Sequence, residues 1–146
     1  HGFLGADRPG LVRAERLEIA EGLIARWGVS GALPAESFLA ASDALSAFAA
    51  SRWPEATWHR ELPLRRRLPD GSVLSGTADL VLDTSDGLVV IDHKSFPGTT
   101  AEAVARASTH AGQLAAYAET VSEAWGKPVL GTFIHLPIGG IVVPVT

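Results

Sequence analysis

The chain has 146 residues, which is the usual size of one domain and too few for two. Hydrophobic residues make up 47% of it, so the chain can bury a core and wholesale disorder is excluded. The formal net charge of -4 argues against a nucleic-acid-binding protein that works by bulk positive charge. The absence of cysteine excludes a disulfide scaffold, a thiolate zinc site, a cysteine-ligated iron–sulfur cluster and a cysteine nucleophile.

The sequence starts at His1 and contains no methionine, which indicates a domain cut from a longer protein or a processed product. It has no run of about 18 apolar residues, so no membrane span is expected. A signal peptide is not expected either, because Asp7, Arg8 and Pro9 lie where one would need an apolar stretch.

Two amphipathic helices are predicted in the first third of the chain. In residues 11–27 the apolar side chains recur with the 3.6-residue period, and Gly28 can end the helix. The second helix covers residues 34–52, where Pro34 suits the first turn. We therefore expect a helical N-terminal part, residues 1–55.

From Trp58 the pattern changes to a period of two, which predicts strands. The even-numbered residues from Trp58 to Leu64 are expected on one face of the first strand, and the odd-numbered ones from His59 to Arg65 on the other. The sequence Pro69-Asp70-Gly71-Ser72 then predicts a turn.

Two more strands should follow as a hairpin. Residues 73–83 are predicted to form the second strand and residues 88–95 the third, with Ser85-Asp86-Gly87 as the turn between them. The near-continuous apolar run of the third strand is typical of a central strand that is buried on both faces.

One long helix at about 100–124 and two strands, at about 128–136 and 141–145, complete the predicted elements. The order α, α, β, β, β, α, β, β indicates an α/β fold in which helices flank a mixed central sheet.

Asp79, Asp92 and Lys94 are the candidate catalytic residues on the strands. Because residues two apart share a face of a strand, Asp92 and Lys94 should project together while His93 points away. The hairpin turn places Asp79 near Asp92 across the ladder, on the same face if the register allows.

An Asp-x-Lys pair by itself can be an exposed ion pair of little consequence. A second carboxylate facing Asp92, however, would add like-charge repulsion and a desolvation penalty. A divalent cation would relieve both, and hard oxygen ligands of this kind select Mg²⁺ or Mn²⁺. Such an ion would polarise a phosphate oxygen, with Lys94 positioning water or stabilising the charge of the transition state.

The helix that follows carries a second polar cluster. Arg106, His110, Gln113 and Tyr117 are spaced 4, 3 and 4 residues apart, so they are expected to share one helix face. An ordinary polar helix face explains the same spacing. The cluster is of interest because this helix directly follows the Asp-x-Lys strand.

Three segments together resemble the PD-(D/E)XK nuclease superfamily: Gly76-Thr-Ala-Asp79, Asp92-His-Lys94 and Gln113-Leu-Ala-Ala-Tyr117. More narrowly, they are similar to the RecB-type nuclease domain at the C-terminus of AddA and RecB helicase–nucleases. The resemblance implies a restriction-endonuclease-like αβββαβ core over residues 56–146 with extra N-terminal helices. The chain, 1–146, would then be a single nuclease domain of a longer helicase–nuclease.

The resemblance also implies roles for individual residues. Asp79 and Asp92 would be metal ligands, with the backbone carbonyl of His93 as a third, and Lys94 would be the catalytic lysine. Gln113 and Tyr117 match the Gln-x-x-x-Tyr motif, which lies beside the active site and contacts DNA or orients the lysine.

Two further metal ligands are suggested in the same way. His1 corresponds to a histidine on the first helix of the family that reaches the metal. Glu61 lies where related domains have an acidic residue, although a solvated strand residue is the simpler interpretation of it. His93 departs from the family pattern, since Tyr or Trp is common between the Asp and the Lys. The lack of cysteine excludes the iron–sulfur members of the family.

Arginines of the first strand can contact DNA phosphates or merely blunt a solvated sheet edge. Their alternation divides them between the two faces. The full set of candidate DNA-binding residues is Arg60, Arg65, Arg67, Arg106, His110, Gln113 and Tyr117. The four tryptophans, among them Trp27, lie at element ends and are expected to anchor the core rather than to stack on bases.

The leading hypothesis is a deoxyribonuclease that uses one or two Mg²⁺ or Mn²⁺ ions for in-line attack on a phosphodiester. The resemblance implies the exonuclease module of a bacterial, cytoplasmic helicase–nuclease in double-strand-break repair and recombination. Its partners would be DNA, a helicase motor in the same polypeptide and a second helicase–nuclease subunit. The alternatives are a catalytically silent nuclease-fold scaffold and a different metal-assisted phosphoesterase.

Overall fold

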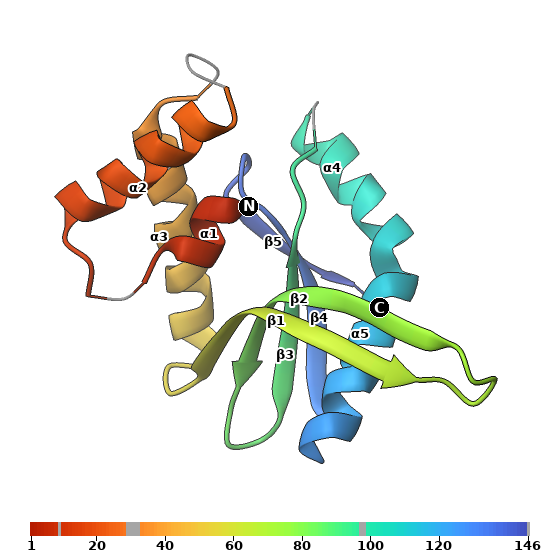
Figure 1. Ribbon diagram of the computed structural model, residues 1–146. Coiled ribbons are helices and arrows are strands. Elements are labelled where there is room, and N and C mark those ends of the chain that lie inside the picture. The colour runs from red at the N-terminus through yellow and green to blue at the C-terminus, as the bar shows by residue number, and fades with distance from the viewer. Residues whose placement is uncertain (9, 29–32, 97–98, 146) are drawn as a thin grey trace.

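The computed structural model describes residues 1–8, 10–28, 33–96 and 99–145, and Figure 1 shows its arrangement. Its centre is one five-stranded sheet of order β1-β2-β3-β4-β5. The strands are β1 (Thr57–Arg67), β2 (Val73–Asp83), β3 (Leu88–His93), β4 (Val129–Leu136) and β5 (Ile141–Val145). Only β3 and β4 pair in parallel; the other neighbours are antiparallel, so the predicted mixed sheet is confirmed.

Helices cover both faces of this sheet (Figure 1). The N-terminal helices are α1 (Gly2–Ala6), α2 (Arg13–Arg26) and α3 (Ala35–Arg52), and the later ones are α4 (Thr100–Ala107), the 3₁₀ turn η1 (Ser108–His110) and α5 (Ala111–Trp125). Strand β3 lies between them with all six of its residues buried, which confirms that it is the central strand. In the described ranges, no helix combines the length and the apolar character needed to cross a membrane.

Three features of the chain differ from the sequence-based expectations. Helix α1 was not predicted from periodicity, although the resemblance places His1 on a helix, and the third strand ends at His93 rather than at residue 95. The long helix predicted at 100–124 is interrupted by η1. There the Thr109 hydroxyl donates a hydrogen bond to the Arg106 carbonyl, and such local side-chain bonds compete with the helical backbone ladder.

The predicted faces of β1 are also wrong, because the strand changes sides at Glu61. Trp58 packs beside Leu80 and Leu82 in the core under α3, whereas Leu62 and Leu64 pack in the core under α5. Glu61 has a φ of 51°, a left-handed conformation that a non-glycine residue rarely adopts. Because the backbone turns at Glu61, the even-numbered residues of β1 face one side of the sheet before it and the other side after it.

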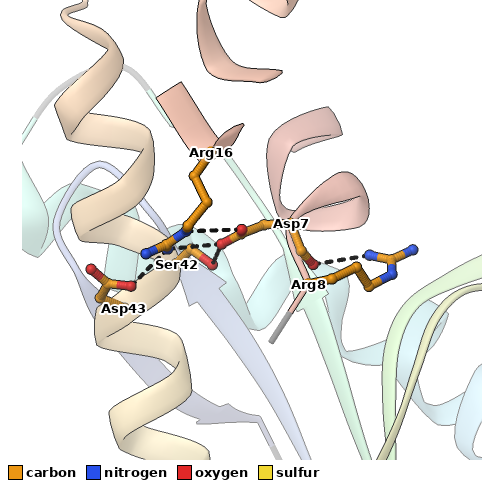
Figure 2. A network of polar contacts seen from close by, with 5 residues as sticks. All are labelled: Asp7, Arg8, Arg16, Ser42 and Asp43. Atoms are coloured by element: carbon orange, nitrogen blue, oxygen red, sulfur yellow. Dashed lines mark hydrogen bonds and ion pairs between the residues drawn. The ribbon is translucent and has the colours of Figure 1, made fainter. Parts of the chain in front are cut away.

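A buried carboxylate ties the three N-terminal helices together, as Figure 2 shows. Asp7, which follows α1, accepts hydrogen bonds from the Arg16 guanidinium of α2 at 2.8 and 3.0 Å and from the Ser42 hydroxyl of α3 at 2.6 Å. Arg16 also donates to Asp43 at 2.7 Å. The network therefore determines where α1, and with it His1, is held.

We expect Asp7→Asn to lower the free energy of unfolding by about 2 kcal/mol, because it removes the charge that compensates the largely buried Arg16. Asp43→Asn is the matched control: Asp43 bonds the same guanidinium, but 62% of its side chain is exposed. It should therefore lose less than about 1 kcal/mol. Urea denaturation measures both, and equal losses would contradict the role assigned to Asp7.

The contribution of Asp7 should also depend on pH. Burial acts to raise the pKa of Asp7, but hydrogen bonds from Arg16 and Ser42 outweigh it and hold the pKa below its ordinary value of 3.8. The stabilisation is thus complete above pH 3.8 and is lost as the pH falls through the lower folded pKa. The stability difference between wild type and Asp7→Asn should be constant near neutral pH and shrink in acid; a difference that grows in acid would contradict this assignment.

Candidate active site

The pairing of β2 with β3 places Asp79 and Asp92 side by side. The β2–β3 ladder pairs Leu80 with Ile91, and continuing this register by one residue sets Asp79 opposite Asp92. The Asp79 carboxylate accepts a hydrogen bond of 2.7 Å from the backbone N–H of His93. This bond fixes the direction of a carboxylate that is only 7% exposed.

His1 and Glu61 join Asp79 in one cluster. The Nε2 atom of His1 lies 3.2 Å from Asp79 Oδ1 and 3.3 Å from Glu61 Oε1. One ligand atom of each residue lies within 4.8 Å of the others. The left-handed backbone of Glu61 brings its carboxylate here, and Gly5 of α1 leaves the room, since a Cβ at Gly5 would lie 2.8 Å from Glu61 Oε1.

The cluster shifts the pKa values of its members in opposite directions. The hydrogen bond to Asp79 raises the pKa of His1 above its ordinary value, although partial burial opposes this. Burial acts to raise the pKa of Asp79, but the bonds from His1 and from the His93 N–H outweigh it, so the pKa is lowered. Asp79 is therefore an anion in a largely buried position, which a cation must compensate.

Asp92 forms a second, adjoining group with Lys94. Lys94 Nζ lies 2.8 Å from Asp92 Oδ2, as expected for residues two apart on one strand face. Asp92 is 2% exposed, and burial, helped by the charge of Asp79, raises its pKa despite Lys94. Apart from Lys94, Oδ2 has no hydrogen-bond partner among the described residues.

His93 points away from Asp92, as expected, and packs against two other histidines. Its ring lies edge-on to His1 at 5.8 Å between centroids, and its Nδ1 is 3.2 Å from Nδ1 of His135 on β4. Burial lowers the pKa of His93 to about 3 and that of His135 to about 4, so both rings are neutral. His135 belongs to no sequence motif, and only the pairing of β3 with β4 places it opposite His93.

Gln113 and Tyr117 lie together on α5, where Gln113 Nε2 donates to Tyr117 Oη at 3.0 Å. Tyr117 covers Gly76 of β2, since a Cβ at Gly76 would overlap Tyr117 Oη. The other two residues of the predicted cluster are on separate elements, with Arg106 on α4 and His110 in η1. His110 packs against Phe96, and its charge acts to lower the pKa of Asp92.

The arginines of β1 do not form one stripe. The Arg60 guanidinium stacks over Trp58 at 4.6 Å, on the side of the N-terminal helices. Arg66 pairs with Glu119 and Glu123 of α5. Arg65 and Arg67 are exposed beyond Glu61.

Comparison with models of known families matches residues 5–143 to the PD-(D/E)XK nuclease superfamily. The chain belongs to this superfamily. Membership supports phosphodiester hydrolysis as the general activity, and the mixed sheet with flanking helices is consistent with its restriction-endonuclease-like fold. No curated protein matches the chain.

PD-(D/E)XK nucleases generally use divalent metal ions, and the donor set of this domain fits one. Asp79 and Glu61 offer hard carboxylate oxygens and His1 offers a ring nitrogen, all within 4.8 Å of one another. The Oδ2 atom of Asp92, which contacts Lys94 Nζ at 2.8 Å, can supply a further oxygen.

We expect Gly76→Ala to displace the Tyr117 ring, because the new methyl group would overlap Tyr117 Oη. The overpacking should lower the free energy of unfolding by about 1–3 kcal/mol. Tyr117 is the only tyrosine of the chain, so NMR of isotopically labelled tyrosine reports its position without ambiguity.

Gly22→Ala is the control for that substitution. Gly22 is inside α2 and a Cβ there meets none of the described residues within 4 Å, so the change should stabilise the helix by about 0.5–1 kcal/mol. Unchanged tyrosine signals and unchanged stability in Gly76→Ala would contradict the close approach of Tyr117.

Proposed function

We propose that this PD-(D/E)XK domain is a DNA nuclease dependent on Mg²⁺ or Mn²⁺. The observation that carries the proposal is the His1–Glu61–Asp79 cluster directly beside the Asp92–Lys94 pair. His1, Glu61, Asp79, Asp92 and the backbone carbonyl of His93 are the residues that would hold one or two ions. When bound, a divalent cation polarises a phosphate oxygen and lowers the pKa of a coordinated water.

The chain's own residues prepare the site for this chemistry. The His93 N–H holds Asp79 in one orientation, and the backbone of Glu61 turns a second carboxylate towards it. Asp92 holds the Lys94 ammonium at the strand end, where it can stabilise the negative charge that develops on the phosphate in the transition state. The neutral, buried pair of His93 and His135 packs directly behind His1.

DNA contacts are proposed around this centre. Gln113 and Tyr117, joined by a hydrogen bond, would orient the strand or Lys94. The exposed side chains of Arg65, Arg67 and Arg106 can reach phosphates, and His110 lies close enough to Asp92 to affect its pKa. Arg60 is the weakest of the proposed contacts, because it is stacked on Trp58.

We further propose a RecB-type context, in which residues 1–146 are one exonuclease domain of a bacterial cytoplasmic helicase–nuclease for double-strand-break repair. The Asp-x-Lys and Gln-x-x-x-Tyr segments support this narrower assignment. The helicase motor would lie in the same polypeptide outside these residues, and a second helicase–nuclease subunit would be its partner. A Gly-x-x-x-x-Gly-Lys-Ser/Thr loop encoded upstream would support this context, and an unrelated upstream sequence would contradict it.

A silent scaffold is the second candidate, and the Lys94–Asp92 ion pair is the observation that favours it. An ion pair already satisfied at 2.8 Å can be structural only. The second buried carboxylate argues against a scaffold, because Asp79 raises the pKa of Asp92 and so opposes its ionisation.

Substitution of Lys94 and of Lys127 distinguishes a nuclease from a silent scaffold. Lys94→Met should lower the rate of DNA hydrolysis in Mg²⁺ or Mn²⁺ by at least about 100-fold, since it removes a charge that stabilises the transition state. Lys127→Met is the matched control, because Lys127 pairs with Asp83 at the other end of β2. The release of acid-soluble nucleotides from labelled DNA measures both rates, and EDTA should abolish the activity.

Asp92→Asn should also lose DNA hydrolysis. Asp83→Asn is its matched control and should keep the activity. Circular dichroism checks that each variant is folded. Equal activity of wild type, Lys94→Met and Asp92→Asn would refute the proposed catalytic site.

A further inference from the structure

Two apolar hollows adjoin His1, outside the cluster of charged groups. The first has a volume of 290 Å³, and its walls include Leu33 and Ile138 with the hydroxyl-bearing Ser37 and Ser95. The second, of 480 Å³, lies towards α2 and is lined by Leu23, Ile24 and Trp27. His1, Phe3 and Phe38 line both hollows, and the two phenylalanine rings meet edge to face at 6.0 Å.

Large apolar side chains around these hollows are left in contact with solvent. Trp27 is 72% exposed, Ile138 is 65% exposed and Leu33 is 44% exposed. The expectation that Trp27 anchors the core is therefore wrong. Exposed apolar groups gathered at a concave surface indicate a binding site rather than incidental exposure.

We propose that the two hollows bind unpaired nucleobases of the strand whose phosphate lies at the His1–Glu61–Asp79 cluster. The inference rests on the proposed nuclease function and names the form of its substrate, a single strand next to the bond that is cut. His1 carries the connection: its Nε2 contacts Asp79 and Glu61, while the same residue forms a wall of both hollows.

The chemistry of the walls favours bases over the sugar–phosphate backbone. Neither hollow has a lysine or arginine among the described residues that line it, so these surfaces cannot hold phosphates by charge. Aromatic and aliphatic walls suit flat rings, and base–aromatic stacking supplies affinity that tolerates any sequence. The Ser37 and Ser95 hydroxyls can bond the polar edge of a base.

The size and the accessibility of the hollows support the same occupant. The volume of the first, 290 Å³, is near the lower end of small-molecule pockets, roughly 300 Å³, which suits one ring system. Bases stacked within a duplex cannot enter such a hollow without being unpaired. A strand that is already single therefore enters the hollows without the free-energy cost of unpairing.

The test compares two labelled strands of equal length, an oligothymidine and an abasic oligomer with the same phosphates but no bases. Binding to the whole chain is measured by fluorescence anisotropy in Ca²⁺, and the strand length is checked after each titration. We expect the wild type to bind the oligothymidine at least about tenfold more tightly. The variants Trp27→Ala and Ile138→Ser should reduce the ratio of the two affinities towards one without weakening the binding of the abasic strand.

Leu130→Ser is the control, because Leu130 is an exposed apolar residue, 47% accessible, at the opposite end of β4. It should leave the ratio unchanged. Equal affinity of the wild type for both strands, or no binding of either, would overturn the proposal. A ratio unaffected by Trp27→Ala and Ile138→Ser would also overturn it and would assign the hollows to another occupant, such as an apolar peptide.

These outcomes are distinct from failure of the proposed function. Hydrolysis of DNA without any preference for the oligothymidine would reject only the proposal that the hollows bind bases. A base preference that depends on Trp27 and Ile138, without hydrolysis in Mg²⁺ or Mn²⁺, would reject the nuclease activity alone.

Discussion

The buried Asp79 carboxylate is the constraint around which this domain is organised. An anion that is only 7% exposed requires compensation, and two separate segments of the chain contribute to it. The His93 N–H donates from β3, His1 approaches from α1, and a divalent cation fits the oxygen atoms that remain. Glu61 and Asp92 add negative charge to the same region, which increases the need for a cation there. Electrostatic strain of this kind is expected at a functional centre and is unfavourable elsewhere.

The N-terminal helices link the stability of the fold to the position of His1 in the site. The Asp7–Arg16–Ser42 network holds α1 against α2 and α3 (Figure 2). Helix α1 in turn presents His1 to Asp79. The same helices supply the walls of the apolar hollows beside His1. The helical part is thus coupled both to the cluster of charged groups and to the surface proposed to bind nucleobases.

The change of face at Glu61 divides β1 between two cores. Before Glu61, Trp58 packs towards α3; after it, Leu62 and Leu64 pack towards α5. The irregular backbone lies opposite Asp79, so the point where the strand changes face is also the point where its carboxylate enters the site. Strained backbone at such a position is consistent with a functional role, because a regular strand would direct Glu61 elsewhere.

The sequence alone determined the strands, the mixed sheet and the superfamily, because period-two patterns, turn residues and motif spacing are local properties. It predicted β2 and β5 with their observed limits and placed Asp92 beside Lys94. The site roles and the RecB-type context stay predictions. Only the tertiary structure decided that α1 forms, that η1 interrupts the helix, that Glu61 turns towards Asp79 and that His135 meets His93. These features depend on contacts between distant segments and on a rare backbone conformation, which no local pattern encodes.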